Sequence, residues 1–276
     1  MSKLSACALV LSACSGSSSV HVDDSGIDGL KGDSIDAPPL MLPPVNAKYD
    51  YQLGGPYTPP AGVTVVSRDY KAAKAEGMFN ICYVDGFQIE RSEEMYWVTN
   101  HPDLILKDGT GMPIRDPKSN EILLDLGLAE KRTAVASLVA MSITQCANLG
   151  YPAVQIGNVD SYTRSQGMLT EQQAVYTLKM LSDHAHALGR AIGQQNGADL
   201  VARRAEIGTD FAVAEECNRN GNCAKYTAGY GDHVLVIEYR QQDFSGGCTA
   251  YPNLSIVLRD ANLVTAGATG YVYDGC

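Results

Sequence analysis

The chain has 276 residues, of which 45% are hydrophobic and 19% charged, and its formal net charge at pH 7 is -10. This length and apolar content suffice for one sizeable core, so we expect a single domain with a terminal extension. The acidic balance argues against nucleic acid as a partner, because binding to phosphates requires a basic surface. It suits a neutral or cationic ligand instead.

Residues 1–14 are typical of an export signal. Lys3 precedes an apolar run over residues 4–13, which is far shorter than the roughly 20 residues of a membrane-spanning helix. The sequence Leu-Ser-Ala-Cys at 11–14 resembles a bacterial lipobox, in which Cys14 would carry the lipid. A plain secretory signal that is cleaved nearby is the alternative. Both hypotheses predict an exported protein, and contact with a membrane is expected only through the lipid anchor.

Residues 15–46 are rich in Ser, Gly, Asp and Pro, and we interpret them as a flexible linker. Such a composition buries too little apolar surface to offset the entropy of ordering the chain. We therefore expect a disordered N-terminal tether, with the folded domain over residues 47–276.

Past the linker, short β-rich runs alternate with helical segments. Apolar residues at three- and four-residue spacing predict helices over 129–149 and 170–188, the second starting with a capping box of Thr170 and Gln173. This alternation indicates a parallel sheet, and eight strands in one domain favour an α/β fold of the closed (β/α)8 TIM type. A ninth apolar run at 254–258 is expected to cap or extend the barrel. The eight predicted strands are 49–53, 64–67, 79–84, 122–126, 153–156, 191–194, 211–214 and 233–238.

Six of the eight cysteines remain when Cys7 and Cys14 are assigned to the signal and the lipid. An even number in an exported protein predicts disulfide bonds. Cys217 and Cys223 bracket a short loop and are the first expected pair. A bond between Cys248 and Cys276 would hold the C-terminus, which leaves Cys82 with Cys146.

Several motifs are missing from the sequence. No cysteine–histidine cluster has zinc spacing, so we predict no metal site. No glycine-rich phosphate loop follows a strand, which argues against a nucleotide, and we predict no cofactor. A Gly-x-Ser-x-Gly elbow is also missing, which argues against a serine hydrolase.

Polar side chains gather where the predicted strands end. In a parallel barrel these ends meet at one face, where the chemistry takes place. Converging carboxylates suit glycoside hydrolysis, in which one acid protonates the leaving oxygen and one carboxylate acts as nucleophile or base. Any one of these residues could instead cap a helix or lie in solvent. The candidates are Gln52, Arg68, Asp69, Tyr83, Asp85, Asp125, Asn158, Asp160, Gln194, Gln195, Asn196, Glu215, Glu216, Glu238 and Tyr239.

Aromatic side chains are the usual platforms for sugar rings, and the chain has fifteen tyrosines but one tryptophan. Tyr83 and Tyr162 lie at predicted strand ends and are expected to line the cleft. Trp97 lies in the long segment between the third and fourth predicted strands, where it either packs on the barrel or forms a sugar platform.

Six short segments occur in the order seen in glycoside hydrolase family 114, the endo-α-1,4-polygalactosaminidase type, and the chain resembles that family from about residue 49 to residue 276. The resemblance implies a TIM-type barrel that cleaves galactosamine-containing polysaccharide with two acidic residues. The acidic net charge would favour a partly deacetylated, cationic polymer. The segments are YQLGG at 51–55, VVSRD at 65–69, NICYV at 80–84, GNVDSY at 157–162, FAVAEEC at 211–217 and VIEY at 236–239.

Position by position, the resemblance places the catalytic glutamate of the family on Glu215. Glu216 is adjacent, and strand alternation allows only one of the two to face the mouth. The catalytic aspartate of the family falls on Gly157, which has no carboxyl group. The expected substrate-binding residues are Gln52, Tyr83, Asp85, Asp125, Asn158, Asp160, Tyr162, Asn196 and Glu238.

Gly157 leaves three hypotheses about activity. In the first, the barrel is a catalytically impaired carbohydrate-binding surface lipoprotein, since ground-state contacts can survive the loss of a catalytic group. In the second, another carboxylate compensates. Asp85 is the candidate because the family often has asparagine there, although an aspartate before Gly86 also suits a plain turn. In the third, the chain is active despite the change. A surface protein whose barrel only contacts another protein is a further alternative, which an exterior apolar patch would favour.

Overall fold

The computed structural model describes residues 39–276, so the expected export signal, Cys14 and most of the expected linker lie outside the described residues. At the end of that linker, Leu40 and Leu42 pack against the apolar interior of the barrel. The ring of His233 lies 3.1 Å from the carbonyl oxygen of Pro43. The last residues of the expected linker are therefore in contact with the folded domain. Within the described part of the chain, no helix is both long and apolar enough to cross a membrane.

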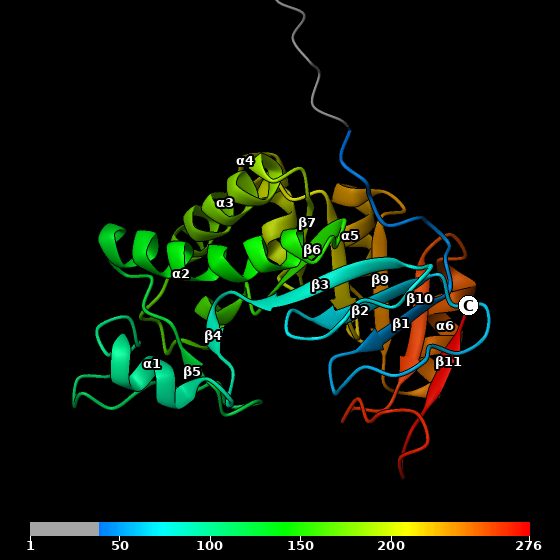
Figure 1. The fold of residues 1–276 in the computed structure, drawn as a ribbon, viewed down its shortest axis with the longest axis horizontal. Coiled ribbons are helices and arrows are strands. Elements are labelled where there is room, and N and C mark those ends of the chain that lie inside the picture. Colours follow the sequence, from blue (N-terminus) through cyan, green and yellow to red (C-terminus); the bar gives the residue numbers. More distant parts are fainter. Residues whose placement is uncertain (1–38) are drawn as a thin grey trace, which may run out of the picture. The chain divides into compact units, whose positions relative to one another are not determined.

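A sheet of parallel strands forms the barrel, and the fold class predicted from the sequence is confirmed (Figure 1). A short C-terminal strand, β11 (Tyr273–Gly275), runs antiparallel to the last barrel strand. The parallel strands, in their order around the barrel, are β1 (Tyr49–Gln52), β2 (Val65–Asp69), β3 (Phe79–Asp85), β6 (Ala153–Gly157), β7 (Ala191–Gln195), β8 (Phe211–Glu215), β9 (Val234–Glu238) and β10 (Ser255–Arg259).

Side chains rather than a continuous ladder join β10 to β1 within residues 39–276. The Arg259 guanidinium donates to the backbone oxygen of Tyr51 and, at 3.2 Å, to a carboxylate oxygen of Asp50. The backbone nitrogen of Ala47 donates to the Ser255 hydroxyl at 3.0 Å. The barrel is therefore nearly closed, and Arg259 and Asp50 at its seam are fully buried.

Two of the strand predictions are wrong in their assignment. The run 122–126 is not a barrel strand, because β5 (Ile122–Leu123) pairs only with β4 (Gln88–Ile89), antiparallel and in a separate sheet. The run 254–258, expected to cap or extend the barrel, contains most of its last parallel strand, β10. Both runs are short and mainly apolar, and such a pattern indicates burial without saying which sheet a strand joins.

Helices pack against the barrel at β3 and from β7 to β10. The predicted helices are confirmed as α2 (Ala129–Asn148) and α3 (Glu171–Ala187), and Thr170 and Gln173 form the capping box. Between β3 and α2 the chain makes an excursion through β4, α1 (Glu94–Asn100) and β5, which are grouped apart from the barrel strands in Figure 1. The remaining helices are α4 (Arg204–Ile207), α5 (Cys223–Tyr230), α6 (Gln241–Ala250) and the short 3₁₀ helices η1 (Ser161–Arg164) and η2 (Ala198–Arg203).

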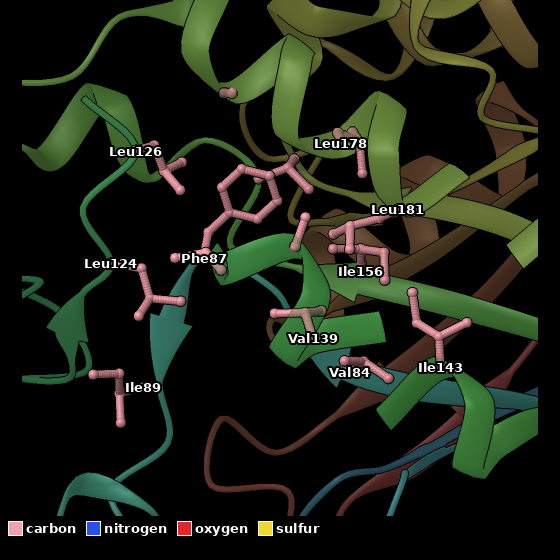
Figure 2. Packing of buried hydrophobic residues seen from close by; sticks show 14 of the residues in the cluster. Val84, Phe87, Ile89, Leu124, Leu126, Val139, Ile143, Ile156, Leu178 and Leu181 are labelled. Carbon is pink, nitrogen blue, oxygen red and sulfur yellow. The ribbon is translucent and has the colours of Figure 1, made fainter. Parts of the chain in front are cut away.

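The largest apolar core lies outside the barrel strands. Outward side chains of β3 and β6, such as Val84 and Ile156, pack in it with residues of α2 and α3. Figure 2 shows Phe87 in the middle of this cluster, between Leu124 of the excursion and Leu178 of α3. The excursion is therefore held by the same core as the helices, which fixes the position of the chain that follows β3.

The three predicted disulfide bonds are confirmed. They are Cys82–Cys146, which joins β3 to α2, Cys217–Cys223, which closes the loop after β8, and Cys248–Cys276, which joins α6 to the C-terminus. Among the described residues, no group of three or more histidine, cysteine or acidic side chains could hold a metal ion.

Candidate active site

Strand alternation brings Glu215 to the mouth of the barrel. Along β8, Phe211 and Val213 lie in the apolar cluster that fills the barrel, and Glu215 continues the same two-residue phase. Glu216 falls in the opposite phase and has a positive φ of 56°. Its carboxylate forms an ion pair with Arg219. Of the two adjacent glutamates, Glu215 is therefore the one that faces the interior.

Three side chains fix the carboxylate of Glu215. One oxygen accepts hydrogen bonds from the amides of Gln195, at 3.0 Å, and Asn196, at 2.8 Å. The other oxygen accepts one from the hydroxyl of Tyr239 at 2.5 Å. The side-chain oxygen of Asn196 also accepts from the backbone nitrogen of Glu215 at 2.8 Å. The ends of neighbouring strands thus hold this carboxylate in one orientation.

A cavity of about 810 Å³ opens over Glu215. This volume falls within the range of about 300–1,000 Å³ that is typical of ligand sites. Glu216 and Arg219 lie at this cavity together with Glu215. Its other lining side chains include Asp160, Tyr162, Asn196, Tyr226 and Tyr239.

A polar chain inside the barrel leads to Glu215. The hydroxyl of Ser67 donates to Gln155 at 3.0 Å, and the amide of Gln155 donates to Gln195 at 2.9 Å. Gln195 in turn donates to the hydroxyl of Tyr51, at 2.9 Å, as well as to Glu215. Since buried polar networks are rigid when their members are satisfied, this chain stabilises the position of the carboxylate.

Gly157 lies at the end of β6, and the ring of Tyr83 occupies the space beside it. A Cβ atom built on Gly157 would lie 2.3 Å from the Tyr83 hydroxyl oxygen and 2.6 Å from Cζ. Both distances are far below van der Waals contact, so no side chain fits at position 157 unless this ring moves.

Asp85 lies on the strand next to Gly157. In the parallel ladder between β3 and β6, Asp85 is the register partner of Gly157. One carboxylate oxygen accepts from the Asn158 amide at 2.9 Å and the other from the backbone nitrogen of Gln88 at 3.2 Å. Burial raises the pKa of Asp85 to about 8. Asp85 and Tyr83 line a second cavity, of about 710 Å³, at the ends of the first barrel strands.

The model of glycoside-hydrolase family GH114 matches residues 32–276. The chain belongs to this family. No curated protein matches it. Among solved structures, Ega3 of Aspergillus fumigatus in complex with galactosamine is similar at 19% identity, over 86% of this chain and 98% of Ega3, with a TM-score of 0.69. The glycoside hydrolase domain of PelA from Pseudomonas aeruginosa is similar at 10% identity, over 80% of this chain and 98% of that domain, with a TM-score of 0.52. At these sequence identities the similarity shows a shared fold and nothing further.

Two residues expected to bind substrate in this GH114 chain lie away from both cavities. Asp125 follows β5, which is outside the barrel, and its carboxylate forms an ion pair with Lys131 at 2.6 Å. Glu238 is fully buried and in phase with the outward-packed Val236, and it accepts a hydrogen bond from the backbone nitrogen of Asn218 at 2.8 Å. Burial raises the pKa of Glu238 to about 7. Neither residue lines either cavity.

The other expected residues lie at or beside the cavities. Gln52 lines the smaller one and is held by Arg68, which donates to it at 2.9 Å. Asp160 and Tyr162 line the larger one, where Asp160 pairs with Arg164 at 2.9 Å. Trp97 is only 7% exposed and packs in the core, so the first of its two interpretations holds.

Gln155, Gln195 and Tyr239 belong to the site of this GH114 chain. The sequence placed Gln195 and Tyr239 at strand ends without assigning them to the site, and it did not single out Gln155. All three have the inward phase of their strands: Ala153 precedes Gln155, and Ile237 precedes Tyr239, in the interior cluster. Counting in steps of two from the buried apolar residues would have found them.

Proposed function

We propose that this protein is a glycoside hydrolase that cleaves α-1,4-linked galactosamine polymers and that Glu215 is its catalytic carboxylate. Membership of family GH114 supports the reaction class, and the galactosamine in the complex with Ega3 supports the sugar. The observation that carries the proposal is the carboxylate of Glu215, oriented by three donors at the floor of a sugar-sized cavity.

The geometry around Glu215 suits reaction at the anomeric carbon. A carboxylate in a glycosidase either attacks this carbon or removes a proton from the attacking water. Both roles need the oxygens to be held in place before the substrate arrives, because reorientation during the reaction adds to the barrier. Gln195, Asn196 and Tyr239 do this here.

We infer that the preferred polymer is partly deacetylated and therefore cationic. The chain carries a net charge of -10, and a surface of one sign raises the local concentration of ligands of the other sign. This effect weakens with ionic strength. Cleavage of the deacetylated polymer should accordingly slow as salt is raised, while cleavage of the fully acetylated polymer should change little.

Binding of the polymer without turnover is the second candidate function. It is favoured by Gly157, which supplies no carboxyl group, and by Tyr83, which fills the space at that position. A binding protein of this kind would retain the two cavities and the oriented Glu215. It would lack a group that donates a proton to the leaving oxygen.

The two functions are separated by the wild type and the Glu215→Gln variant on a deacetylated α-1,4-galactosamine polymer. We expect the wild type to release reducing ends and Glu215→Gln to lose at least about 10³ in rate, since it removes the group that acts on the anomeric carbon. Calorimetry should find the polymer bound by both. Glu216→Gln, at the neighbouring position, should lose less than about tenfold. A wild type that binds without releasing reducing ends would establish the second function.

We also propose that the protein is exported and lipidated on Cys14. Its three disulfide bonds fit an oxidising compartment. Cells that express the full chain should incorporate labelled fatty acid into the wild type and none into Cys14→Ser. Equal labelling of both would contradict lipidation at this residue.

A further inference from the structure

Hydrolysis through Glu215 requires a partner that protonates the leaving oxygen. Position 157 cannot supply it, because Gly157 has no carboxyl group and Tyr83 occupies the space beside it. The neighbouring strand β3 has a carboxyl group at the position that pairs with Gly157. Asp85 is the ladder partner of Gly157, and adjacent strands lie only about 4.8 Å apart.

Asp85 faces the same side of β3 as the residues that fill the barrel. Ile81 belongs to the interior cluster, and Tyr83 and Asp85 follow it in steps of two. Asp85 lines the cavity of about 710 Å³ at the barrel mouth, beside Tyr83. This cavity is not the one over Glu215, so a polymer bound at the mouth of the barrel has to reach both for Asp85 and Glu215 to act on one glycosidic bond.

The end of β6, which has no carboxyl group of its own, holds the carboxyl group of Asp85 on the neighbouring strand β3. Asn158 directly follows Gly157, has a positive φ of 59°, and donates its amide to Asp85 at 2.9 Å. The backbone nitrogen of Gln88 holds the second oxygen at 3.2 Å. With its pKa raised to about 8 by burial, Asp85 carries a proton at neutral pH.

Other carboxyl groups near the mouth are less suited to donate a proton. Asp160 is paired with Arg164 at 2.9 Å and lines the cavity over Glu215 rather than the one that Asp85 lines. Asp69, at the end of β2, is the main rival because it lines the same cavity as Asp85, and burial raises its pKa to about 6. It lies one strand further from Gly157 than Asp85 does.

We propose that Asp85 is the general acid of this site and replaces the carboxyl group that position 157 lacks. The inference rests on the proposed hydrolase function with Glu215. In the first step a carboxylate oxygen of Glu215 bonds to the anomeric carbon as the bond to the glycosidic oxygen breaks; the electron pair of that bond stays on the glycosidic oxygen, which takes the proton of Asp85. In the second step water displaces Glu215 from the anomeric carbon, its oxygen stays on the sugar as a hydroxyl group, and its other proton goes to Asp85, so both carboxyl groups return to their starting state.

The test compares Asp85→Asn with the rival Asp69→Asn on two substrates, the deacetylated polymer and a dinitrophenyl glycoside of a galactosamine oligomer. A dinitrophenolate leaves without protonation, so loss of the acid should affect the polymer alone. We expect Asp85→Asn to slow polymer cleavage by about 10²–10⁴ and dinitrophenyl cleavage by less than about tenfold. Asp69→Asn should not show this split.

The pH profile gives a second readout. Polymer cleavage by the wild type should fall above about pH 8, where Asp85 loses its proton, and Asp85→Asn should lack this alkaline limb. Other charged groups also line the cavities that Asp85 lines, and Asp69→Asn must retain the limb if Asp85 causes it. These groups are Asp69, Lys71, Glu90, Arg91, Glu93 and Glu121.

The outcomes separate this inference from the function on which it rests. If the wild type releases neither reducing ends nor dinitrophenolate, the hydrolase proposal fails, and the role of Asp85 fails with it. If the wild type cleaves the polymer and a folded Asp85→Asn, or Asp85→Ala, cleaves it as fast, the assignment of Asp85 alone is wrong. An equal loss on both substrates would assign Asp85 a structural role and also overturn the inference.

Discussion

The contact between Gly157 and Tyr83 predicts the effect of a single added methyl group. In Gly157→Ala the new Cβ would lie 2.3 Å from the Tyr83 hydroxyl oxygen and 2.6 Å from Cζ. The backbone of Gly157 is not in the left-handed region, so alanine adds no backbone strain there. The whole effect should therefore come from the ring of Tyr83, which is stiff and has to move as a unit.

Extra atoms in a packed site destabilise a protein by about 1–3 kcal/mol. For a domain of this size, each kcal/mol lowers the melting temperature by about 2–4 °C. Gly157→Ala should thus melt about 2–12 °C below the wild type, and urea unfolding should give the matching loss in the free energy of unfolding. Gly167→Ala would be a poor comparison because of its positive φ, whereas Gly109→Ala has open space around its Cβ and serves as the control.

A double-mutant cycle tests the cause. Tyr83→Ala removes the ring and leaves room at position 157, so Gly157→Ala should be nearly neutral in that background. The coupling energy between the two substitutions should be about 1–3 kcal/mol, which is well above the error of additivity for independent sites. Additive losses, or a Gly157→Ala variant as stable as the wild type, would refute the claim that Tyr83 fills this position.

Two further predictions concern stability. Burial raises the pKa of Glu238 to about 7, above its ordinary value of 4.5, so the folded state holds this proton more tightly than the unfolded chain does. The free energy of unfolding of the wild type should therefore fall as pH rises from about 5 to 7, and urea titrations should find a smaller fall in Glu238→Gln; an unchanged fall would show that other groups cause it. Replacing both cysteines of Cys82–Cys146 by serine opens a loop of 64 residues, and the same change at Cys217–Cys223 opens one of 6. Loop entropy alone predicts losses of about 4 and 2 kcal/mol, and an equal or reversed order in denaturant unfolding would contradict it.

Much of the fold could be predicted from the sequence because its determinants are local. The spacing of apolar residues located α2 and α3, and strand–helix alternation indicated the barrel. The assignment of the runs 122–126 and 254–258 failed because both are short and mainly apolar. Which sheet such a strand joins depends on partners far along the chain, here β4 for the first run and β9 for the second.

The candidate site divides in the same way. Glu215 and Tyr239 follow from a two-residue phase that is visible in the sequence, and the outward phase of Glu238 could have been read by the same rule. The filling of the space at Gly157 by Tyr83 could not, because it depends on how far a side chain on one strand reaches across its neighbour.

The central claim is that this barrel hydrolyses its polymer without a carboxyl group at position 157. Its most direct test follows reducing ends released from a deacetylated galactosamine polymer by the wild type and by Gly157→Asp. We predict that the wild type cleaves and that Gly157→Asp is no faster, because Tyr83 occupies the space and Asp85 already supplies the proton. Cleavage by Gly157→Asp alone would contradict this account and make the wild type a binding protein.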